Sequence, residues 1–319
     1  MLENFTQYIL KNLNKVSDMV KQYTNVEEII SFLNAKNHSI KNIHEKIIGF
    51  KSLSSAKKGD ATFCQARGKV GHSKVLSSNA SLIICHTSLR SITKKTHSNL
   101  IFVDKPRLWF LRCMKKFVLS TTLYGIHPTS VIESKKIGRN VYIGPFAYVE
   151  KNVTIGDNAI IHGNVTIYSN TRIGNNVIID SSTVIGSDGF GFEKNDSMQW
   201  EKFPHVGGIE IHDNVEIGAN VCIDRGTLDN TIIGEGTKID NLVHVAHNVR
   251  IGRNCIVVAQ SLLGGSCILD DNVHVAMSAS IRDGIKIGKN AVIGMGSVVT
   301  KDVSDNTIVI GIPARPYKK

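Results

Sequence analysis

An aliphatic residue returns at every sixth position through two long stretches of the C-terminal part of this chain. The first run is Val131, Ile137, Ile143, Val149, Ile155, Ile161, Ile167, Ile173, Ile179 and Ile185, and the second is Ile233, Ile239, Val245, Ile251, Val257, Leu263, Leu269, Val275, Ile281, Ile287, Ile293 and Val299. A helix repeats about every 3.6 residues and a strand every 2, so neither explains this pattern. Three hexads make a coil of three short strands. Because one hexad cannot bury its aliphatic side chain alone, the coils must stack, and the sequence predicts a solenoid.

The regular spacing is interrupted twice. The step from Ile185 to Ile217 is not a whole number of hexads, and the intervening segment is rich in glycine and aromatic residues, so we expect a loop at about residues 187–214 that leaves the solenoid. The step from Ile217 to Ile233 falls two short of a full coil, which we interpret as two residues missing from one turn near Asp224–Asp229. Extruded loops are where solenoids carry function, so these breaks mark the region to search.

The N-terminal part follows a different pattern. Apolar residues from Leu2 to Val20 recur at helical spacing, and lysines accompany that face, so this helix is expected to pack on a domain or partner, with membrane-surface contact as the alternative. A second helix is predicted from the capping-box spacing of Thr24 and Glu27, with Asn37 as its end. We therefore expect N-terminal helices over residues 1–37.

Residues 38–122 are predicted to form a small α/β domain, ahead of the solenoid at residues 123–316. Strands are expected at residues 81–85 and 99–103. A helix is expected after Pro106, and its predicted sheet-facing residues are Leu108, Phe110, Leu111, Met114 and Phe117. The overall prediction is a mainly β protein.

Charge, cysteines and hydropathy limit the possible settings. Residues 1–125 hold 20 Lys and Arg against 7 Asp and Glu, which leaves 18 (38 − 20) against 20 (27 − 7) for the remainder. The N-terminal excess favours an anionic ligand or partner, with a merely basic surface as the alternative. The six cysteines have no metal-ligand spacing and are interpreted as reduced, buried fillers. With neither a signal peptide nor an apolar run long enough to span a bilayer, the expected location is cytoplasmic.

Four motifs point to one family. Residues 239–249 read Ile-Asp-Asn-Leu-Val-His-Val-Ala-His-Asn-Val, residues 189–192 Gly-Phe-Gly-Phe, residues 223–229 Ile-Asp-Arg-Gly-Thr-Leu-Asp and residues 59–63 Gly-Asp-Ala-Thr-Phe. Together they resemble the UDP-3-O-acylglucosamine N-acyltransferase family of lipid A biosynthesis. The resemblance implies a left-handed parallel β-helix, a homotrimer, no metal or bound cofactor, an acyl carrier protein as donor and a nucleotide-linked amino sugar as acceptor. Nucleic acid is not expected as a partner.

The resemblance assigns His247 as the general base that takes a proton from the sugar amine. An amine attacking a thioester must lose a proton near neutral pH, and imidazole titrates in that range, so the chemistry agrees. The alternative is a polar corner residue. Gly265 is three hexads further on and should lie one coil away, about 4.8 Å along the stack. Its N–H could stabilise the oxyanion, as the matching glycine does in the family.

Further substrate contacts are proposed around this pair. Asp229 and Asp240 are two carboxylates of which either could orient His247 or hold the substrate ammonium, and Asn241 is a possible sugar contact. His244 is either a substrate contact or an exposed strand residue. Phe190 and Phe192 either line an acyl groove or pack the loop onto the solenoid.

The chain departs from the family in three places. Gly284 occupies the position of a second functional histidine, and Cys64–Lys69 lacks the Asn and Tyr that hold uracil in the family. The C-terminal sequence Gly-Ile-Pro-Ala-Arg resembles that of coenzyme-A-dependent acetyltransferases, in which Arg315 would meet phosphate. Two alternatives therefore stay open: an acetyl-coenzyme-A-dependent nucleotide-sugar N-acetyltransferase, and a non-catalytic β-helix scaffold.

Overall fold

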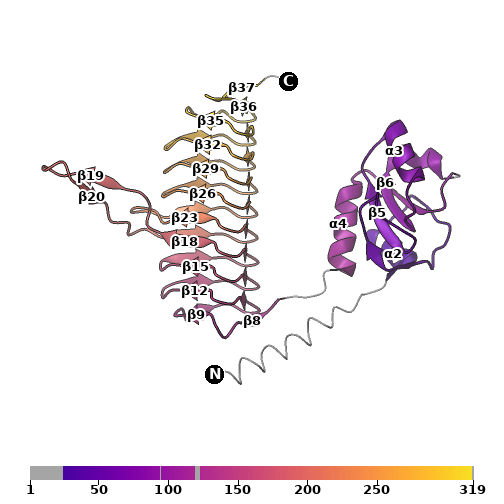
Figure 1. The fold of residues 1–319 in the computed structure, drawn as a ribbon, viewed down its shortest axis with the longest axis horizontal. Coiled ribbons are helices and arrows are strands. Elements are labelled where there is room, and N and C mark those ends of the chain that lie inside the picture. The colour runs from indigo at the N-terminus through magenta and orange to yellow at the C-terminus, as the bar shows by residue number, and fades with distance from the viewer. Residues whose placement is uncertain (1–23, 94, 119–122, 318–319) are drawn as a thin grey trace. The chain divides into compact units, whose positions relative to one another are not determined.

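The computed structural model describes residues 24–93, 95–118 and 123–317. The chain divides into two compact units, Met1–Thr122 and Leu123–Lys319, whose elements are labelled in Figure 1. The helix predicted for Leu2–Val20 lies outside the described residues.

The N-terminal unit is a five-stranded sheet with helices, in the strand order β2-β7-β6-β5-β4. Its elements are β1 (Thr24–Asn25), α2 (Val26–Leu33), β2 (His38–Ser39), β3 (Lys46–Ile47), β4 (Gly49–Phe50), β5 (Asp60–Cys64), α3 (Gly68–Leu76), β6 (Leu82–His86), the 3-10 helix η1 (Thr87–Ile92), β7 (Asn99–Val103) and α4 (Pro106–Phe117). Helix α4 packs on β5 and β6, with Phe110 and Cys113 buried against the sheet.

Two predictions for this unit need correction. Helix α2 is capped by Asn25, whose side chain accepts from the Glu28 N–H, and it ends in a left-handed cap at Asn34 rather than at Asn37. The capping pair is thus shifted by one residue from the one predicted, because the same spacing occurs at both registers. On α4, Leu108 and Leu111 are exposed, since the helix turns its Phe110–Cys113 side to the sheet.

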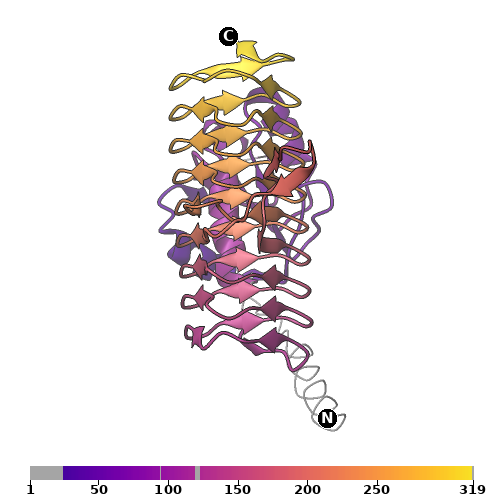
Figure 2. The same ribbon diagram turned by 90° about the vertical axis from the view of Figure 1, so that its left-hand side faces the viewer.

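The C-terminal unit is a β-helix built from three parallel sheets, seen as a stack of flat coils in Figure 2. The first sheet contains β8 (Gly125–Ile126), β11 (Tyr142–Ile143), β14 (Ile160–Ile161), β17 (Ile178–Ile179), β22 (Glu216–Ile217), β25 (Lys238–Ile239), β28 (Ile256–Val257), β31 (His274–Val275), β34 (Val292–Ile293), β36 (Ile308–Ile310) and the antiparallel β37 (Arg315–Pro316). The second contains β9 (Val131–Ile132), β12 (Tyr148–Val149), β15 (Thr166–Ile167), β18 (Val184–Ser187), β23 (Cys222–Asp224), β26 (His244–Val245), β29 (Leu262–Leu263), β32 (Ser280–Ile281) and β35 (Val298–Val299). The third contains β10 (Lys136–Ile137), β13 (Thr154–Ile155), β16 (Thr171–Ile173), β21 (Ile209–Ile211), β24 (Thr231–Ile233), β27 (Arg250–Ile251), β30 (Ile268–Leu269) and β33 (Lys286–Ile287).

The repeated aliphatic position supplies the core of this unit. The second residue of most two-residue strands points inward, and one continuous cluster of such aliphatic side chains fills the stack. In the first coil Ile132 rather than Val131 faces the core, since Val149 pairs with Ile132 and Val131 is exposed. Cys222 is also an exception to the prediction of buried cysteines, because it is the outward residue of β23.

Asparagines shape many of the corners between strands. Asn158, Asn176 and Asn214 adopt left-handed backbone conformations, with φ of 58°, 55° and 60°, which asparagine tolerates better than most residues. The amide of each reaches the next along the stack, at 3.3 Å for both pairs. The corner residue therefore turns the chain and joins neighbouring coils at once.

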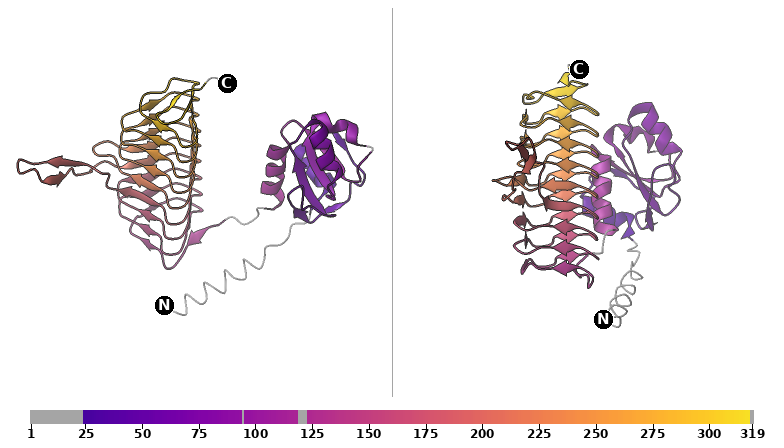
Figure 3. Two further views of the ribbon diagram at one scale, coloured as in Figure 1. Left: turned by 45° about the horizontal axis from the view of Figure 1, so that its top comes forward. Right: turned by 60° about the vertical axis from the view of Figure 1, so that its left-hand side comes forward.

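Both breaks in the repeat lie where the second sheet turns into the third, which we call the insertion edge. Ile185 pairs with Ile223 instead of with Phe203, the residue three hexads further on. The chain therefore contains an insertion of 20 residues (223 − 203) between β18 and β21. The inserted residues form an arm, residues 188–208, with the hairpin β19 (Phe192–Lys194) and β20 (Trp200–Lys202), which projects from the stack in Figure 3. The predicted end near residue 214 is too late, because β21 is already regular at Ile209.

The second break is an insertion and not a deletion. Ile211 pairs with Ile233 instead of with Asp229, the residue three hexads further on. The coil is therefore four residues (233 − 229) longer than a regular one. The segment from Ile217 to Ile233 contains two regular hexads and the inserted residues. Its length equals that of a three-hexad coil that lacks two residues, so spacing alone does not distinguish the two cases. The prediction of two missing residues is therefore wrong. The added residues form a bulge, residues 225–230, on the same insertion edge as the arm.

Candidate active site

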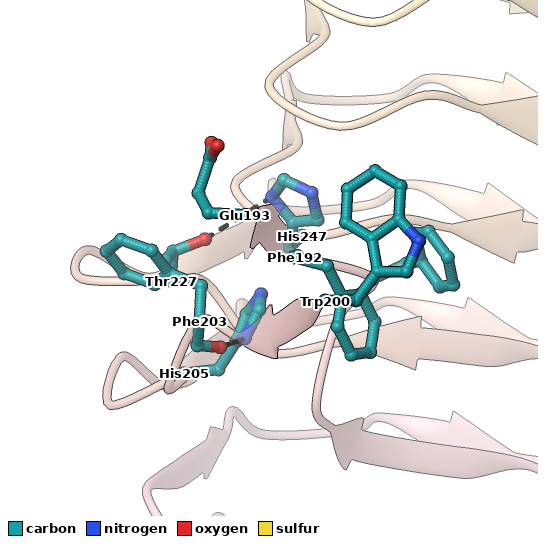
Figure 4. A pocket seen from close by; sticks show the side chains of 9 residues that line it. Phe192, Glu193, Trp200, Phe203, His205, Thr227 and His247 are labelled. Carbon is teal, nitrogen blue, oxygen red and sulfur yellow. Dashed lines mark hydrogen bonds between the residues drawn. The ribbon is translucent and has the colours of Figure 1, made fainter. Parts of the chain in front are cut away.

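A pocket lies at the insertion edge, where the arm and the bulge meet a regular corner of the stack. It encloses about 570 Å³ and is lined by Phe190, Gly191, Phe192, Glu193, Trp200, Phe203, His205, Thr227 and His247, most of which are labelled in Figure 4. The arm supplies the aromatic wall, the bulge supplies Thr227, and the corner after β26 supplies His247. The interruption of the repeat is thus what creates the concave surface.

The imidazole of His247 is held through one ring nitrogen. Its Nδ1 lies 3.1 Å from Asn248 Oδ1 and 3.4 Å from Thr227 Oγ1. The Asn248 oxygen also accepts from the Thr227 N–H at 2.8 Å, which identifies it as an acceptor. The hydrogen of His247 is therefore on Nδ1, and the Nε2 lone pair is available as a base.

Gly265 lies against the other side of the His247 ring. A Cβ added at Gly265 would fall 2.8 Å from Cε1 and 2.9 Å from Nε2, so only glycine leaves the ring in this place. The two coils are joined by the Ser266 N–H, which donates to the His247 carbonyl at 2.9 Å. Within the described part of the chain, no hydrogen bond uses the Gly265 N–H, whereas the corner N–H of Arg253 donates to Asp271 one coil on.

The arm presents its aromatic residues to the pocket. The rings of Phe190 and Phe192 contact each other in a tilted arrangement with centroids 5.0 Å apart, and Trp200 and Phe203 complete the wall. Phe190 is 86% exposed, which disagrees with the alternative that it packs the arm onto the solenoid. These residues form an apolar surface without a covering group among the described residues.

Ion pairs fix the base of the arm. Asp188 contacts Lys202 across the arm and lies 3.7 Å from Arg225 Nε, which also donates to the Gly186 carbonyl at 2.7 Å. The hydrogen bond from Lys202 lowers the pKa of the Asp188 carboxyl. Because Arg225 belongs to the bulge, this contact joins the two insertions.

Two further ionisable groups are buried at the pocket: His205 belongs to its lining, and Asp224 lies outside the lining. His205 is 7% exposed and its ring meets that of His247 at 71°, with centroids 5.5 Å apart. Asp224 is also buried and lies 3.6 Å from His244 Nε2. Burial raises the pKa of the Asp224 carboxyl, against the opposing effects of His244 and of the Ser187 hydroxyl. His244 thus has a structural partner, and its side chain is only partly exposed.

The structure separates several predicted residues from His247 within one chain. Asp240 and Asn241 lie at the corner between the first and second sheets, where Asp240 accepts from the Asn241 and Ala259 N–H groups. Asp229 is exposed in the bulge. Neither carboxylate contacts His247 Nδ1, so the prediction that one of them orients the ring is corrected to Asn248 and Thr227. Arg315 lies in β37, in the last turns of the stack.

Sequence reasoning missed four residues at or near the pocket, namely Asn248, Thr227, His205 and Asp224. Asn248 follows the predicted base directly, and a corner asparagine beside a histidine is a signal that could have found it. Thr227 and Asp224 fall within the motif at residues 223–229, but interpreting the second break as a deletion displaced them. His205 lies in the arm, where no periodicity indicates which residues turn inward.

Comparison with known proteins places the chain among acyltransferases. A family model described as bacterial transferase hexapeptide (six repeats) matches residues 134–169, 230–265 and 266–301. A UDP-3-O-acylglucosamine N-acyltransferase from Campylobacter lari is 38% identical over 280 residues, which are 84% of this chain and 87% of that protein. One from Caulobacter sp. is 46% identical over 95 residues, 30% of this chain and 28% of that protein.

Solved structures give the same result for the β-helix. LpxA, a UDP-N-acetylglucosamine acyltransferase from Bacteroides fragilis, is 34% identical with a TM-score of 0.54, covering 60% of this chain and 74% of that one. LpxA from Acinetobacter baumannii is 26% identical with a TM-score of 0.55, covering 60% and 73%. The left-handed hexapeptide-repeat β-helix preceded by a small α/β region is confirmed. Among the described residues, no helix has the length and apolar character needed to cross a bilayer.

Proposed function

Since the chain belongs to the UDP-3-O-acylglucosamine N-acyltransferase family, we propose that it transfers an acyl group from a thioester to the amine of UDP-3-O-acylglucosamine in lipid A biosynthesis. The observation that carries the catalytic part is the position of His247 Nε2 beside Gly265 in a pocket with an apolar wall.

His247 acts as the general base of this transfer. The sugar amine attacks the thioester carbonyl carbon, and its proton passes to Nε2 as the new C–N bond forms. The C–S bond then breaks, and the imidazolium returns the proton to the departing sulfur. The fixed Nδ1–H keeps the ring in the required tautomer throughout, which is the contribution of Asn248 and Thr227.

Gly265 supplies the oxyanion contact. Negative charge develops on the carbonyl oxygen during the attack, and a fixed N–H aimed at that oxygen stabilises the transition state. The Gly265 N–H meets this need because it lies beside Nε2 and enters no hydrogen bond among the described residues. Removing one such donor typically costs about 10²–10³ in kcat.

The aromatic wall holds an acyl chain. Phe190, Phe192, Trp200 and Phe203 line one side of the pocket that contains His247, so a chain bound there ends at the base. A pocket of this size and character favours a long acyl chain over acetyl. We therefore place acyl carrier protein first as the donor carrier, with acetyl-coenzyme A as the alternative that the C-terminal sequence and Arg315 suggested.

The outward side chains support a homotrimer. On the first sheet Ile160, Ile178, Ile256 and Val292 point outward, and on the second Val184, Leu262 and Val298 do so. The third sheet presents mainly charged residues, Lys136, Arg172, Glu210, Arg250 and Lys286, beside Ile232 and Ile268, and the first sheet also carries Glu216 and Lys238. The apolar stretches of the first and second sheets fit the closed ring of three copies that is typical of such β-helix acyltransferases.

Such a ring gives the remaining predicted residues a place. Asp240 and Asn241 lie at the other edge of the second sheet from His247, so a neighbouring copy is the means by which they reach the site. There they would contact the amine or the sugar. His244 and Asp229 remain candidate substrate contacts at a site that a neighbouring copy completes. The N-terminal unit is proposed to hold the nucleotide, with Arg67 and Lys69 at the start of α3 near the phosphates.

The test is an acyl-transfer assay with UDP-3-O-acylglucosamine and long-chain acyl carrier protein or acetyl-coenzyme A as donors. We expect turnover with the long-chain donor and a loss of at least about 10²-fold in His247→Ala. Turnover with acetyl-coenzyme A alone would favour the acetyltransferase, and no turnover with any donor would favour the scaffold.

Mixing His247→Ala with Asn241→Ala subunits tests the shared site. Each variant alone should be impaired, and mixed trimers should regain part of the activity, because one interface then holds both native residues. Failure to regain activity in trimers that have exchanged subunits would contradict a site completed by a neighbour.

A further inference from the structure

His205 has a buried ring nitrogen without a partner. Its Nδ1 lies 2.9 Å from the Phe203 carbonyl oxygen, and a carbonyl can only accept, so the hydrogen is on Nδ1. The Nε2 atom then carries a lone pair, is sealed from solvent and has no hydrogen-bond partner among the described residues. A buried acceptor left unpaired is costly and calls for an explanation.

The Gly-Phe-Gly-Phe segment closes around this ring. A Cβ on Gly189 would lie 2.9 Å from His205 Nε2, and one on Gly191 would lie 3.1 Å from its Cε1. Side chains at both positions would therefore push the ring away. The two glycines allow the backbone to approach the imidazole, and the phenylalanines between and after them point to the pocket wall.

The unpaired nitrogen faces the proposed base. The same Cβ on Gly189 would lie 2.8 Å from His247 Cδ2. Gly189 therefore lies beside both the His205 nitrogen and the Cδ2 edge of the His247 ring. Figure 4 shows His205 below His247, with the nitrogen that is not bonded to Phe203 directed toward it. Nε2 is closed off from solvent, and the His205 ring that carries it contacts the ring of His247.

Three carboxylates lie near the His205–His247 pair. Asp224 and Asp188 are the carboxylates that interact electrostatically with His205, and Asp224 also interacts with His247. Asp188 is neutralised by Lys202 and Arg225, and Asp224 is opposed by His244. Glu193 lines the pocket itself. A lone pair that faces His247 adds to this field in the direction that favours positive charge on its ring.

We propose that His205 is a positioning residue for the base: it anchors the Gly-Phe-Gly-Phe segment and keeps an acceptor-only nitrogen against His247, which stabilises the imidazolium that forms during the transfer. This inference depends on the proposed function, because the charge on His247 arises only when the amine gives up its proton. A fixed dipole aimed at developing charge lowers the barrier without reorganisation. The interaction belongs to the transition state and should therefore affect kcat rather than KM.

The test compares two substitutions at this position. His205→Phe keeps a ring of similar shape but removes both nitrogens. His205→Gln keeps one donor for the Phe203 carbonyl and one acceptor for the space below His247, and it does not titrate. We expect His205→Phe to lower kcat by about tenfold or more, with KM for both substrates unchanged. His205→Gln should retain most of the wild-type kcat. His212→Phe, at the residue that follows β21 and outside the pocket lining, is the control and should match wild type.

A second readout separates this role from simple packing. Loss of a group that favours positive charge on the base should move the acid limb of the kcat–pH profile to lower pH in His205→Phe than in wild type. Fluorescence of Trp200 in the arm checks that the arm is intact.

Three outcomes are decisive. The kcat loss with unchanged KM, rescued by glutamine, supports the proposal. A raised KM with unchanged kcat and pH profile would mean that His205 only packs the arm, and would overturn it. If His247→Ala itself keeps full activity, the proposed function fails, whatever His205 does.

Discussion

Gly265 lies one coil from His247 and touches its ring, so that a side-chain carbon at 265 would come within 2.9 Å of the basic nitrogen. Gly265→Ala should therefore displace the imidazole and lower kcat by about 10²-fold, with little effect on thermal unfolding. The matched control is Gly284→Asn one coil further on. Gly284 has a φ of 67° and no atom within 4 Å of an added Cβ, and asparagine is common at such corners, so this variant should keep its activity. Equal losses in both variants would contradict the assignment.

The carboxamide oxygen of Asn248 fixes the tautomer of His247, and this role can be tested by substitution. Asn248→Gly retains the left-handed backbone, with its φ of 62°, but removes the oxygen that faces Nδ1. We expect kcat to fall by about tenfold, because loss of one hydrogen bond to a group that becomes charged has that scale. Asn248→Asp keeps an acceptor oxygen and should stay close to wild type. Steady-state kinetics on the three proteins decide the matter, and a larger loss in Asn248→Asp than in Asn248→Gly would contradict it.

Trp200 forms part of the aromatic wall and is 65% exposed, so its removal should affect substrate more than stability. Trp200→Ala is expected to raise KM for long-chain substrates by about tenfold and to leave short-chain ones unaffected, since the lost apolar contact matters only to a chain that reaches it. Met198→Ala, an exposed apolar residue of the same arm outside the pocket, is the control. Chain-length profiles of kcat/KM provide the measurement, and a uniform loss across lengths would speak against an acyl wall.

Burial raises the pKa of the Asp224 carboxyl, and the folded state therefore holds its proton more tightly than the unfolded state does. A group of this kind favours folding at low pH, and that contribution is lost as pH rises from the ordinary value of 3.8 through the raised one. Asp224→Asn should accordingly be more stable than wild type at neutral pH, and the difference should shrink toward about pH 4. Thermal melts of both proteins across this window test the sign, and a wild type that gains on the variant as pH rises would contradict it.

The sequence was sufficient for the β-helix because a single inward position per hexad carries the core, and every third hexad repeats a sheet. It also placed Gly265 beside His247, since no residue is inserted between their coils and the regular spacing of three hexads holds there. The same arithmetic failed one coil earlier. Val245 pairs with Ile223 instead of with Thr227, the residue three hexads before it, so the predicted neighbour Asp229 is displaced into the bulge.

What the repeat could not predict is the path of the inserted residues. The arm and the bulge have no periodicity, so nothing in their spacing shows that His205 turns inward while Phe190 remains exposed. Asp240 and Asn241 illustrate a second limit, because their distance along the chain from His247 is short but a strand of the second sheet separates the two corners. Residues close in sequence can therefore lie at different edges of the β-helix, and only those at the same edge can contact each other.

The most direct test of the catalytic assignment is the kcat of His247→Ala with UDP-3-O-acylglucosamine and its acyl donor, measured with and without added imidazole. Loss of the base should reduce kcat by at least about 10²-fold, and neutral imidazole that fits the vacated space should restore part of it in proportion to its concentration. A His247→Ala protein that is correctly folded and turns over at the wild-type rate would contradict the central claim.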